Sequence, residues 1–463
     1  MYIKIILEKN INFKKMNRYV FKIVSTIIII SSIASSQTFN ITENKLELKD
    51  FHYISNIGYS QIKNPLNEYF DPHIKLNSSD QLVFSFDILN ESYNGNYAYT
   101  FIHCNSNWTI SNLNQSEYLN GFTDNYIDNY LYSFNTTTEY INYEILFPNE
   151  NVNFSKSGNY IILIYDVEKN IPLITKRFVV YEQIVNIETH IKKPSILMNM
   201  KSKHEINFII NDYKKLNIID FSNDINVVIK QNNDWSKTMQ NCYPSFIHPQ
   251  YMEFNNYDEF LFLAGSEFRD FDIKNLEYLG NHIKQHQLLS TKTLQNKPSL
   301  NLLSLENDNY HHITLYTDQK KDTNNYLFSY DLNGKYVLAN ENHKDMRSEG
   351  EYALVNFSLK HEKLISKEIY VYGELTNWNK LQKNKMIYNQ ETKQYECSIY
   401  LKQGYYNYKY IITDSTQNII HNHIESNFYE TRNKYTIYIY HTPLWQNYDR
   451  IIGISQGTSN SLN

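Results

Sequence analysis

Apolar side chains recur at every second position in many short segments after residue 37. The pattern is clearest in residues 82–88, where Leu82, Phe84, Phe86 and Ile88 alternate with other residues. A period of two places them on one face of a β-strand, which predicts a strand with one buried face. Similar segments follow at 97–103, 142–147, 160–167 and 176–181. Short strands separated by turn residues predict a first β-sandwich at residues 37–182.

Two further units continue this pattern. The first, residues 183–347, has strand-like segments at 205–210, 225–230, 259–263 and 310–316. The second, residues 348–443, has them at 353–359, 368–373, 394–401, 405–412 and 435–440. Lys402-Gln403-Gly404 has the composition of a hairpin turn between two of these strands. Helical periodicity is absent over any length, so we expect an all-β chain of tandem immunoglobulin-like β-sandwiches, with a polar tail at 444–463.

The N-terminus has the order of charges and apolar residues that is typical of an export signal. Four basic residues between 14 and 22 precede an apolar run at 23–33, and small residues follow at 34–36. This predicts a signal peptide at residues 1–36, cleaved after Ser36, with Met16 as an alternative initiator. The other interpretation, an uncleaved anchor helix, needs a longer apolar run. No cysteine follows the run, so we expect no lipid attachment.

Composition supports strands and argues against nucleic acid as a partner. The 463 residues include 42 Tyr and 24 Phe but only 12 Gly and 9 Pro, and aromatic residues suit pleated, half-buried surfaces. Residues 1–36 hold six basic residues and one acidic residue, a net of +5, so their removal changes the charge from −5 to −10. An acidic surface repels phosphate backbones. The three cysteines, Cys104, Cys242 and Cys397, are far apart, and we expect them to be buried thiols with no disulfide or zinc.

A search for catalytic motifs finds no enzyme signature. The chain lacks GxSxG, HExxH, a Walker loop and GxGxxG,. The adjacent His311 and His312 would point to opposite faces of a strand and could not share one metal. Asp87, Glu144 and Asp166 lie on predicted strands, where acids on the solvent face are common. We therefore predict no catalytic residues, no metal and no cofactor.

The third unit resembles a known carbohydrate-binding fold. A strand is followed by Gly-Glu-Leu-Thr-Asn-Trp at 373–378, and a later segment ends in Tyr-Lys-Tyr at 408–410. This is similar to the glycogen-binding or early-set immunoglobulin-like domains appended to glucan enzymes. The resemblance implies that Trp378 could stack on a sugar. The alternative is that Trp378 anchors a loop or the core, because the second sugar-stacking Trp has no counterpart and Tyr395 occupies the nearest place.

Several blocks in the first two units carry a broader resemblance, and they occur in a fixed order. They are HCNSNW at 103–108, QSEYLNGF at 115–122, YSFNT at 132–136, FPNEN at 147–151, SGNY at 157–160, RF at 177–178 and EFRDFDI at 267–273. This order resembles the Bacteroidetes family of type IX secretion system plug proteins, first catalogued as a domain of unknown function. The segments around Trp378 and at 401–410 resemble the C-terminal part of that family.

The resemblance implies a non-enzymatic periplasmic protein associated with the outer membrane. Its implied partner is the giant outer-membrane β-barrel translocon, whose periplasmic opening it would bind and seal, and the free protein is expected to be monomeric. Candidate contact residues are Trp108, Tyr118, Phe122, Phe268 and Phe271, each of which could instead be structural. The alternatives are a carbohydrate-binding envelope protein that uses Trp378, and a polysaccharide hydrolase.

Overall fold

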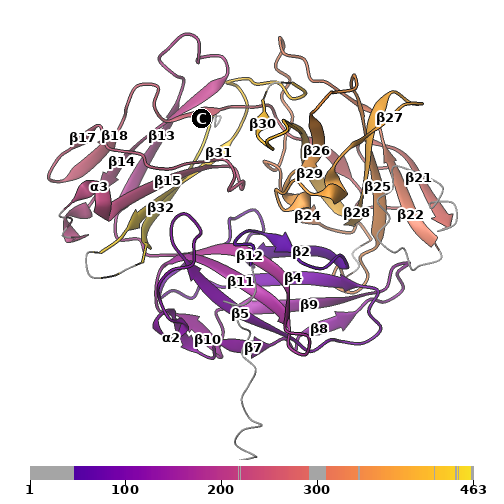
Figure 1. Ribbon diagram of the computed structural model, residues 1–463, viewed down its shortest axis with the longest axis horizontal. Coiled ribbons are helices and arrows are strands. Elements are labelled where there is room, and N and C mark those ends of the chain that lie inside the picture. The colour runs from indigo at the N-terminus through magenta and orange to yellow at the C-terminus, as the bar shows by residue number, and fades with distance from the viewer. Residues whose placement is uncertain are drawn as a thin grey trace, which may run out of the picture. The chain divides into compact units, whose positions relative to one another are not determined.

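The computed structural model describes residues 46–459, except 217, 219, 291–308, 343–344, 422, 444–445 and 447. The predicted signal peptide at 1–36 lies outside these residues. Strands dominate the described part. Its α-helical segments, α2 (Gln115–Tyr118) and α3 (Phe221–Asp224), have four residues each. The predicted all-β class of tandem sandwiches is confirmed (Figure 1). Three pairs of sheets each enclose a separate hydrophobic core.

The first sandwich is built from residues 51–181. One sheet has the order β1 (Phe51–His52), β12 (Ile171–Tyr181), β11 (Gly158–Asp166), β5 (Tyr97–Cys104) and β7 (Asp124–Tyr126), with β3 (His73–Lys75) parallel to β12. The other has the order β2 (Ile57–Lys63), β4 (Leu82–Leu89), β9 (Tyr140–Phe147) and β8 (Tyr130–Tyr132), and β6 (Leu119–Gly121) pairs with β10 (Val152–Phe154). Phe84 and Phe86, two of the alternating apolar residues, are fully buried in the core between these sheets, and Phe86 stacks on Tyr143.

The second sandwich combines two distant parts of the chain. One sheet has the order β13 (Asn186–Lys192), β14 (Lys203–Asn211), β18 (Tyr251–Phe254) and β17 (Phe246–Ile247), with β19 (Leu261–Leu263) beside β14. The other has the order β16 (Thr238–Met239), β15 (Ile225–Gln231), β31 (Lys434–His441) and β32 (Arg450–Thr458). In Figure 1 the C-terminal strands β31 and β32, in yellow, therefore lie beside the magenta strand β15.

The third sandwich takes its strands from residues 269–420. One layer is centred on β29 (Gly404–Thr413), which pairs with β20 (Arg269–Asp272), β24 (Tyr336–Leu338), β26 (Glu368–Tyr372) and β30 (Ile419–Ile420). The other has the order β21 (Ile283–Ser290), β22 (Asn309–Leu315), β25 (Tyr352–Lys360), β28 (Gln394–Lys402) and β27 (Ile387–Asn389), with β23 (Asp318–Gln319) beside β25. The strands β20 to β24, which precede residue 348, thus belong to the same core as β25 to β30, which follow it.

Two predicted boundaries do not match these sheets. The units 183–347 and 348–443 were expected to be contiguous, but β20 to β24 join the third core and β31 joins the second. The segment 444–463 was expected to be a polar tail, yet its residues 450–458 form β32, paired along its length with β31. The reason is that Ile451 and Ile452 bury their side chains against the second sandwich. The polar residues around them hid this short apolar stretch.

The predicted hairpin at Lys402-Gln403-Gly404 is also wrong. The strands β28 and β29 flank it, but β28 pairs with β25 and β27, whereas β29 pairs with strands of the opposite sheet. The chain therefore crosses from one layer of the third sandwich to the other at Gln403. A side chain at Gly404 would place its Cβ 2.4 Å from the Val337 carbonyl oxygen, so the corner requires glycine.

Candidate functional site

A single carboxylate joins all three sandwiches. Asp71, just before β3 of the first sandwich, is 3% exposed. It lies 2.9 Å from Lys434 Nζ and 3.9 Å from Lys230 Nζ of the second sandwich, and 3.1 Å from Lys335 Nζ of the third. Burial raises the pKa of Asp71, but the three ammonium groups outweigh it and hold the pKa well below 3.8,. Asp71 is therefore ionised and surrounded by excess positive charge.

A second buried ion pair joins the first and third sandwiches. Asp87 of β4 and Lys402 of β28 are 2.5 Å apart, and both side chains are fully buried. Asp87 also accepts hydrogen bonds from Asn142 and from the Tyr352 hydroxyl at 2.7 and 2.8 Å. Lys402 Nζ lies 4.0 Å from the centre of the Tyr140 ring. Every atom of this pair has a partner, which is the condition under which a buried ion pair is tolerated.

Aromatic side chains close the junction between the first and second sandwiches. Trp108 packs edge-on against Trp235 with ring centroids 4.8 Å apart. The Arg177 guanidinium lies 5.4 Å from the Trp108 ring and 5.9 Å from the Trp235 ring. Asp50 holds Arg177 in place through a 3.2 Å ion pair. The predicted contact residue Trp108 thus belongs to an internal junction of the chain.

The other predicted contact residues lie mainly in the cores, which fits the structural alternative that the sequence left open for each of them. Tyr118 is 3% exposed, and its hydroxyl donates to the Phe101 carbonyl oxygen at 3.0 Å. Phe271 is fully buried and stacks on Tyr406. Phe268 is 6% exposed. These side chains cannot touch a partner while the cores stay packed, because each is an inward-facing residue of a strand, of a short helix or of a segment beside a strand.

Trp378 is likewise unavailable for stacking on a sugar. It is 7% exposed and packs edge-on against Phe268 and Tyr372. Gly334 makes room for it, because a Cβ at Gly334 would lie 2.4 Å from the Trp378 ring. The interpretation of Trp378 as a loop and core anchor, which the sequence left open, is the one that fits this packing.

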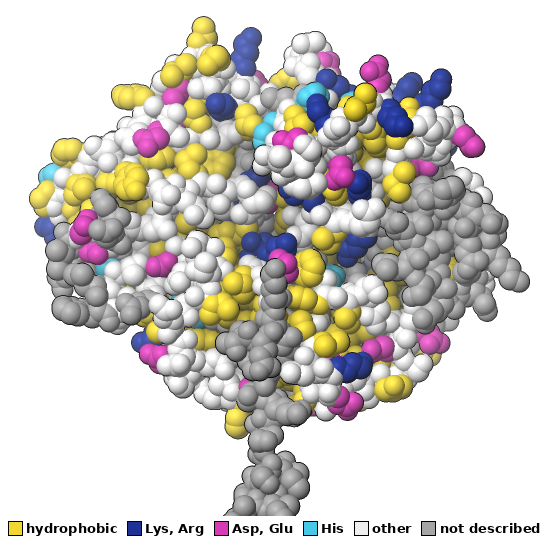
Figure 2. Space-filling model, viewed as in Figure 1, with side chains coloured by type: hydrophobic (Ala, Val, Ile, Leu, Met, Phe, Trp, Pro, Cys, Tyr) yellow, Lys and Arg dark blue, Asp and Glu magenta, His cyan; other side chains and the backbone are white. Residues whose placement is uncertain are grey.

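Phe122 differs from the other candidates because its side chain is 66% exposed. Its backbone N–H donates to the Asn151 carbonyl oxygen at 2.8 Å, which fixes the segment that carries it. Other large apolar side chains are exposed in the same stretch of the first sandwich. They are Tyr126, Leu131, Tyr132 and Phe134, with exposed fractions of 61, 37, 48 and 70%. In the view of Figure 2, charged side chains of both signs are interspersed with apolar ones.

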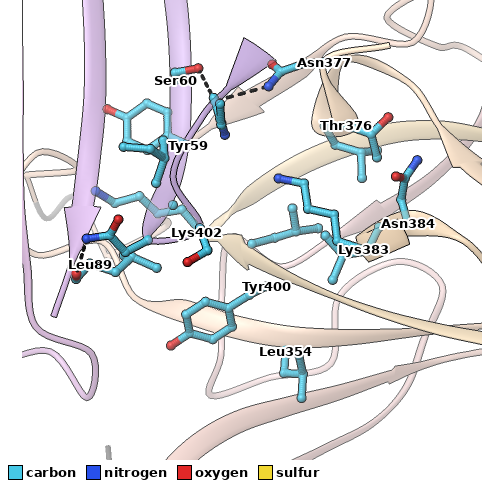
Figure 3. A pocket seen from close by; sticks show the side chains of 18 of the residues that line it. Tyr59, Ser60, Leu89, Leu354, Thr376, Asn377, Lys383, Asn384, Tyr400 and Lys402 are labelled. Atoms are coloured by element: carbon cyan, nitrogen blue, oxygen red, sulfur yellow. Dashed lines mark hydrogen bonds between the residues drawn. The ribbon is translucent and has the colours of Figure 1, made fainter. Parts of the chain in front are cut away.

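A cavity of about 140 Å³ lies where the first and third sandwiches meet. Residues of both sandwiches line it, as Figure 3 shows for Tyr59 and Leu89 on one side and Lys383 and Tyr400 on the other. No local pattern in the sequence signals this cavity, because its two walls come from distant parts of the chain, residues 52–138 and 310–406.

Among the residues that the structure describes, the cysteines and histidines do not gather into a metal site. Cys104, Cys242 and Cys397 are free and buried, as predicted, and burial raises the pKa of each thiol to about 12. His311 Nδ1 lies 2.9 Å from His286 Nε2 of the neighbouring strand. Among residues 46–459 that the structure describes, no group of three or more His, Cys, Asp or Glu could hold a metal. In the same part of the chain, no helix is long and apolar enough to span a membrane.

Comparison with known families matches two parts of the chain. Residues 57–182, which cover most of the first sandwich, match the first domain of type 9 secretion system plug proteins. Residues 356–438 match the glycogen recognition site of AMP-activated protein kinase. The chain belongs to the type 9 secretion system plug protein family. This confirms both resemblances, and both matched families are of non-catalytic types.

Solved structures extend the comparison to the whole described chain. A hypothetical protein from Parabacteroides merdae ATCC 43184 is 30% identical, with a TM-score of 0.81 over 89% of this chain and 100% of that one. The C-terminal domain of the Streptococcus pyogenes antigen I/II-family protein AspA is 6% identical over 88% of this chain and 99% of that one, with a TM-score of 0.14, too low to indicate a shared fold. A comparison with curated proteins gives no match.

The plug-family match relates the chain to type 9 secretion and to the cell envelope in which that system works. The matched residues include the HCNSNW, QSEYLNGF and SGNY blocks, which carry Trp108, Tyr118 and Gly158. In this plug-family protein those blocks build the first sandwich and its junction with the second. Gly158, for example, has φ of 152°, and a Cβ there would lie 2.3 Å from His103 Nε2. The blocks therefore preserve packing and do not by themselves mark a contact surface.

Proposed function

We propose that this protein is a periplasmic plug that binds the β-barrel translocon of the type IX secretion system and seals its periplasmic opening. The match of residues 57–182 to the plug-protein first domain carries this proposal. The plug acts by contact between folded surfaces, with no bond made or broken. It is a separate exported chain that is monomeric when free.

Ion pairs between the sandwiches support such a role. A protein that closes a pore must keep its shape while it is bound. If its sandwiches moved freely relative to one another, the pore would leak. Here Asp71 connects all three sandwiches, and Asp87 with Lys402 connects two of them. A broken buried ion pair costs several kcal/mol, about 3 to 5. These contacts therefore oppose any opening of the junctions.

Exposed aromatic residues of the first sandwich supply a plausible contact area. Phe122, Tyr126 and Phe134 are more than half exposed, and aromatic side chains bury a large area with few rotatable bonds,. A plug must also leave the pore, so its interface should be modest and partly polar. We place the contact on residues 122–134 of the first sandwich.

Permeability of a deletion strain tests the sealing role. Loss of the gene should let large antibiotics, normally excluded by the outer membrane, enter the cell, and the intact gene should restore exclusion. A triple variant, Phe122→Ala with Tyr126→Ala and Phe134→Ala, should be exported and folded but should fail to restore it. The matched control is Leu197→Ala with Met198→Ala, two side chains 80 and 84% exposed on the second sandwich. If the deletion leaves permeability unchanged, the sealing role is wrong.

Affinity purification tests the partner. The tagged protein, extracted with mild detergent, should recover a very large outer-membrane β-barrel, and the triple variant should recover several-fold less. Recovery of no barrel across several detergents would count against the proposal. Equal recovery by the triple variant would move the contact surface away from residues 122–134 while keeping the partner.

A carbohydrate-binding role is the second candidate, favoured by the match of residues 356–438 to a glycogen recognition site. The buried Trp378 does not support it, since a sugar would have to displace Phe268 and Tyr372. Titration of the whole protein with malto-oligosaccharides tests it directly. Saturable binding at micromolar sugar would support a carbohydrate-binding role. If no heat of binding is measured up to millimolar sugar, that role is wrong.

A further inference from the structure

The cavity between the first and third sandwiches has a polar end with two unpaired donors. Lys383, in the third sandwich, extends its amine into the cavity (Figure 3). Among the described residues, no acceptor or carboxylate is within bonding distance of this amine. Burial lowers the pKa of Lys383, and the positive charge of Lys176 lowers it further. The amine is thus short of a negative partner.

His52 lines the same cavity and supplies the second donor. A chain of hydrogen bonds fixes its tautomer. Lys176 Nζ donates to Asn377 Oδ1 at 2.7 Å, because an ammonium group can only donate,. That contact turns the Asn377 amide so that Nδ2 donates to His52 Nε2 at 3.2 Å. The Ser60 hydroxyl oxygen lies 2.7 Å from the same nitrogen and, being able to donate as well as accept, donates to it when Nε2 is the acceptor,.

The consequence for His52 is that Nε2 accepts and Nδ1 carries the proton. Burial lowers the pKa of His52 well below 6.5, and Lys383 and Lys176 lower it further, so the ring is neutral at pH 7. A neutral ring has one N–H. His52 Nδ1 has no hydrogen-bond partner although it is buried. A buried donor without an acceptor is unfavourable, so the site needs an acceptor.

The remaining walls of the cavity are largely apolar. Leu354, Ile399 and Leu401 of the third sandwich, together with Ile57 and Leu89 of the first, line it alongside Tyr310 and Tyr400. A cavity of about 150 Å³ with such walls binds benzene in another protein. The volume of about 140 Å³ here is of the same size. The cavity thus fits a ring or a short branched chain.

We propose that this cavity binds a small monocarboxylate with an apolar body, one oxygen on the Lys383 amine and the other on His52 Nδ1–H. A carboxylate only accepts hydrogen bonds, and it brings a negative charge to the Lys383 amine. The cavity's own carboxylate, Glu374, instead accepts from the Tyr336 backbone N–H at 3.1 Å. Phosphate would need more donors than these two. The inference goes beyond the plug role and is measured on the isolated protein, so either can fail without the other.

Binding of benzoate, used as the probe, tests this site by isothermal titration and by thermal unfolding. Benzoate should bind the wild-type protein at one site and raise its melting temperature, because it contacts both sandwiches. Benzamide has the same shape without the charge and should bind at least tenfold more weakly, given the strength of charged hydrogen bonds. Inorganic phosphate should not bind at the same concentration.

A matched pair of lysine variants locates the site. Lys383→Met keeps the length of the side chain and should fold normally, since no contact of the amine is lost, but should bind benzoate about tenfold or more weakly. Lys363→Met, at an exposed lysine of the same sandwich, should bind as the wild type does. A ¹⁵N NMR spectrum should show His52 protonated on Nδ1 before and after benzoate is added.

Several results would overturn the proposal. They are the absence of benzoate binding, equal binding by Lys383→Met and wild type, and a His52 ring protonated on Nε2. Tighter binding of phosphate than of benzoate would also reject the carboxylate assignment. A crystal structure with benzoate should place its carboxylate between Lys383 and His52, and density for water alone there would contradict it.

Discussion

Asp71 and Asp87 are both buried carboxylates at junctions between sandwiches, yet their environments push their pKa values in opposite directions. Asp71 lies near three lysines, and its pKa is held well below 3.8. Asp87 lies near one lysine, Lys402. Burial raises the pKa of Asp87, and the charge of Lys402 together with the hydrogen bonds that Asp87 accepts offsets this only in part. Burial also lowers the pKa of Lys402. The comparison shows that the count of opposite charges decides the outcome, because burial is complete in both cases.

The two junctions therefore differ in what they depend on. At Asp71 the lysines depend on the carboxylate: burial already lowers the pKa of Lys230 to about 8 with Asp71 present. At Asp87 the pair is balanced, and neither charge is in excess. We expect the Asp71 junction to be sensitive to loss of one residue. The Asp87 junction should tolerate removal of both partners together.

Asp71→Asn should have the largest effect. It leaves Lys230, Lys335 and Lys434 without a carboxylate, and removal of one partner from a buried ionic cluster destabilises by about 3 to 5 kcal/mol. We expect the upper end of this range from urea unfolding followed by tyrosine fluorescence. Asp212→Asn, at an exposed aspartate, is the control and should change the free energy of unfolding by less than about 0.5 kcal/mol. An effect of Asp71→Asn as small as the control would show that the cluster does not hold the sandwiches together.

Asp87→Asn should come next, at about 3 kcal/mol. It leaves one buried ammonium, Lys402, with an amide in place of a carboxylate. The same urea titration measures it, alongside Asp71→Asn. A larger loss for Asp87→Asn than for Asp71→Asn would reverse the comparison, and would mean that counting lysines does not predict the strength of a junction.

The pH dependence of these two variants should differ between pH 7 and 4. Because the folded pKa of Asp71 is lowered, its contribution is present above 3.8 and is lost only as pH falls through that lowered value. The titration of Asp71 itself should therefore not change the difference between wild type and Asp71→Asn from pH 7 to about 4. The folded pKa of Asp87 is raised, so its titration contributes stability below 3.8 that is lost as pH rises through the raised value.

The free energy of unfolding of the wild type should therefore rise relative to that of Asp87→Asn as pH falls towards 3.8, by at most about 1.4 kcal/mol per pH unit. Urea unfolding at pH 7, 6, 5 and 4 measures both differences. Parallel pH profiles for the two variants would contradict the opposite pKa directions.

The double replacement Asp87→Leu with Lys402→Met should have the smallest effect. Exchange of a balanced buried pair for apolar side chains of similar size is often neutral or stabilising. We expect a free energy of unfolding within about 1 kcal/mol of the wild type, less than either single change. A loss of more than about 3 kcal/mol would show that the pair is needed beyond its own charge balance.

The sequence predicted the strands well because their signal is local. Alternation in residues 82–88 put Phe84 and Phe86 on a buried face, where the structure has them. The isolated Cys104 was expected to be a buried thiol and is one. The ordered blocks between 103 and 273 pointed to the plug family, which the comparisons confirm.

Features that depend on distant partners were missed or misplaced. Asp87 was expected on a solvent face, but the residue that neutralises it, Lys402, lies 315 positions further along the chain. Phe271, a candidate contact residue that could instead be structural, is fully buried. The strand 435–440 was assigned to the third unit, although it pairs with β15 of the second. No local pattern could give these pairings, since an alternating strand fits any sheet edge.

The amino-acid sequence by itself determined which segments become strands, which face of each strand avoids water, and the family to which the chain belongs. Only the tertiary structure decided which strands share a core, which charges meet at Asp71 and Asp87, and where Lys383 and His52 converge on a cavity. The physical reason is range: strand periodicity is set by neighbouring residues, whereas charge pairing and packing are set by side chains that folding brings together from hundreds of residues apart.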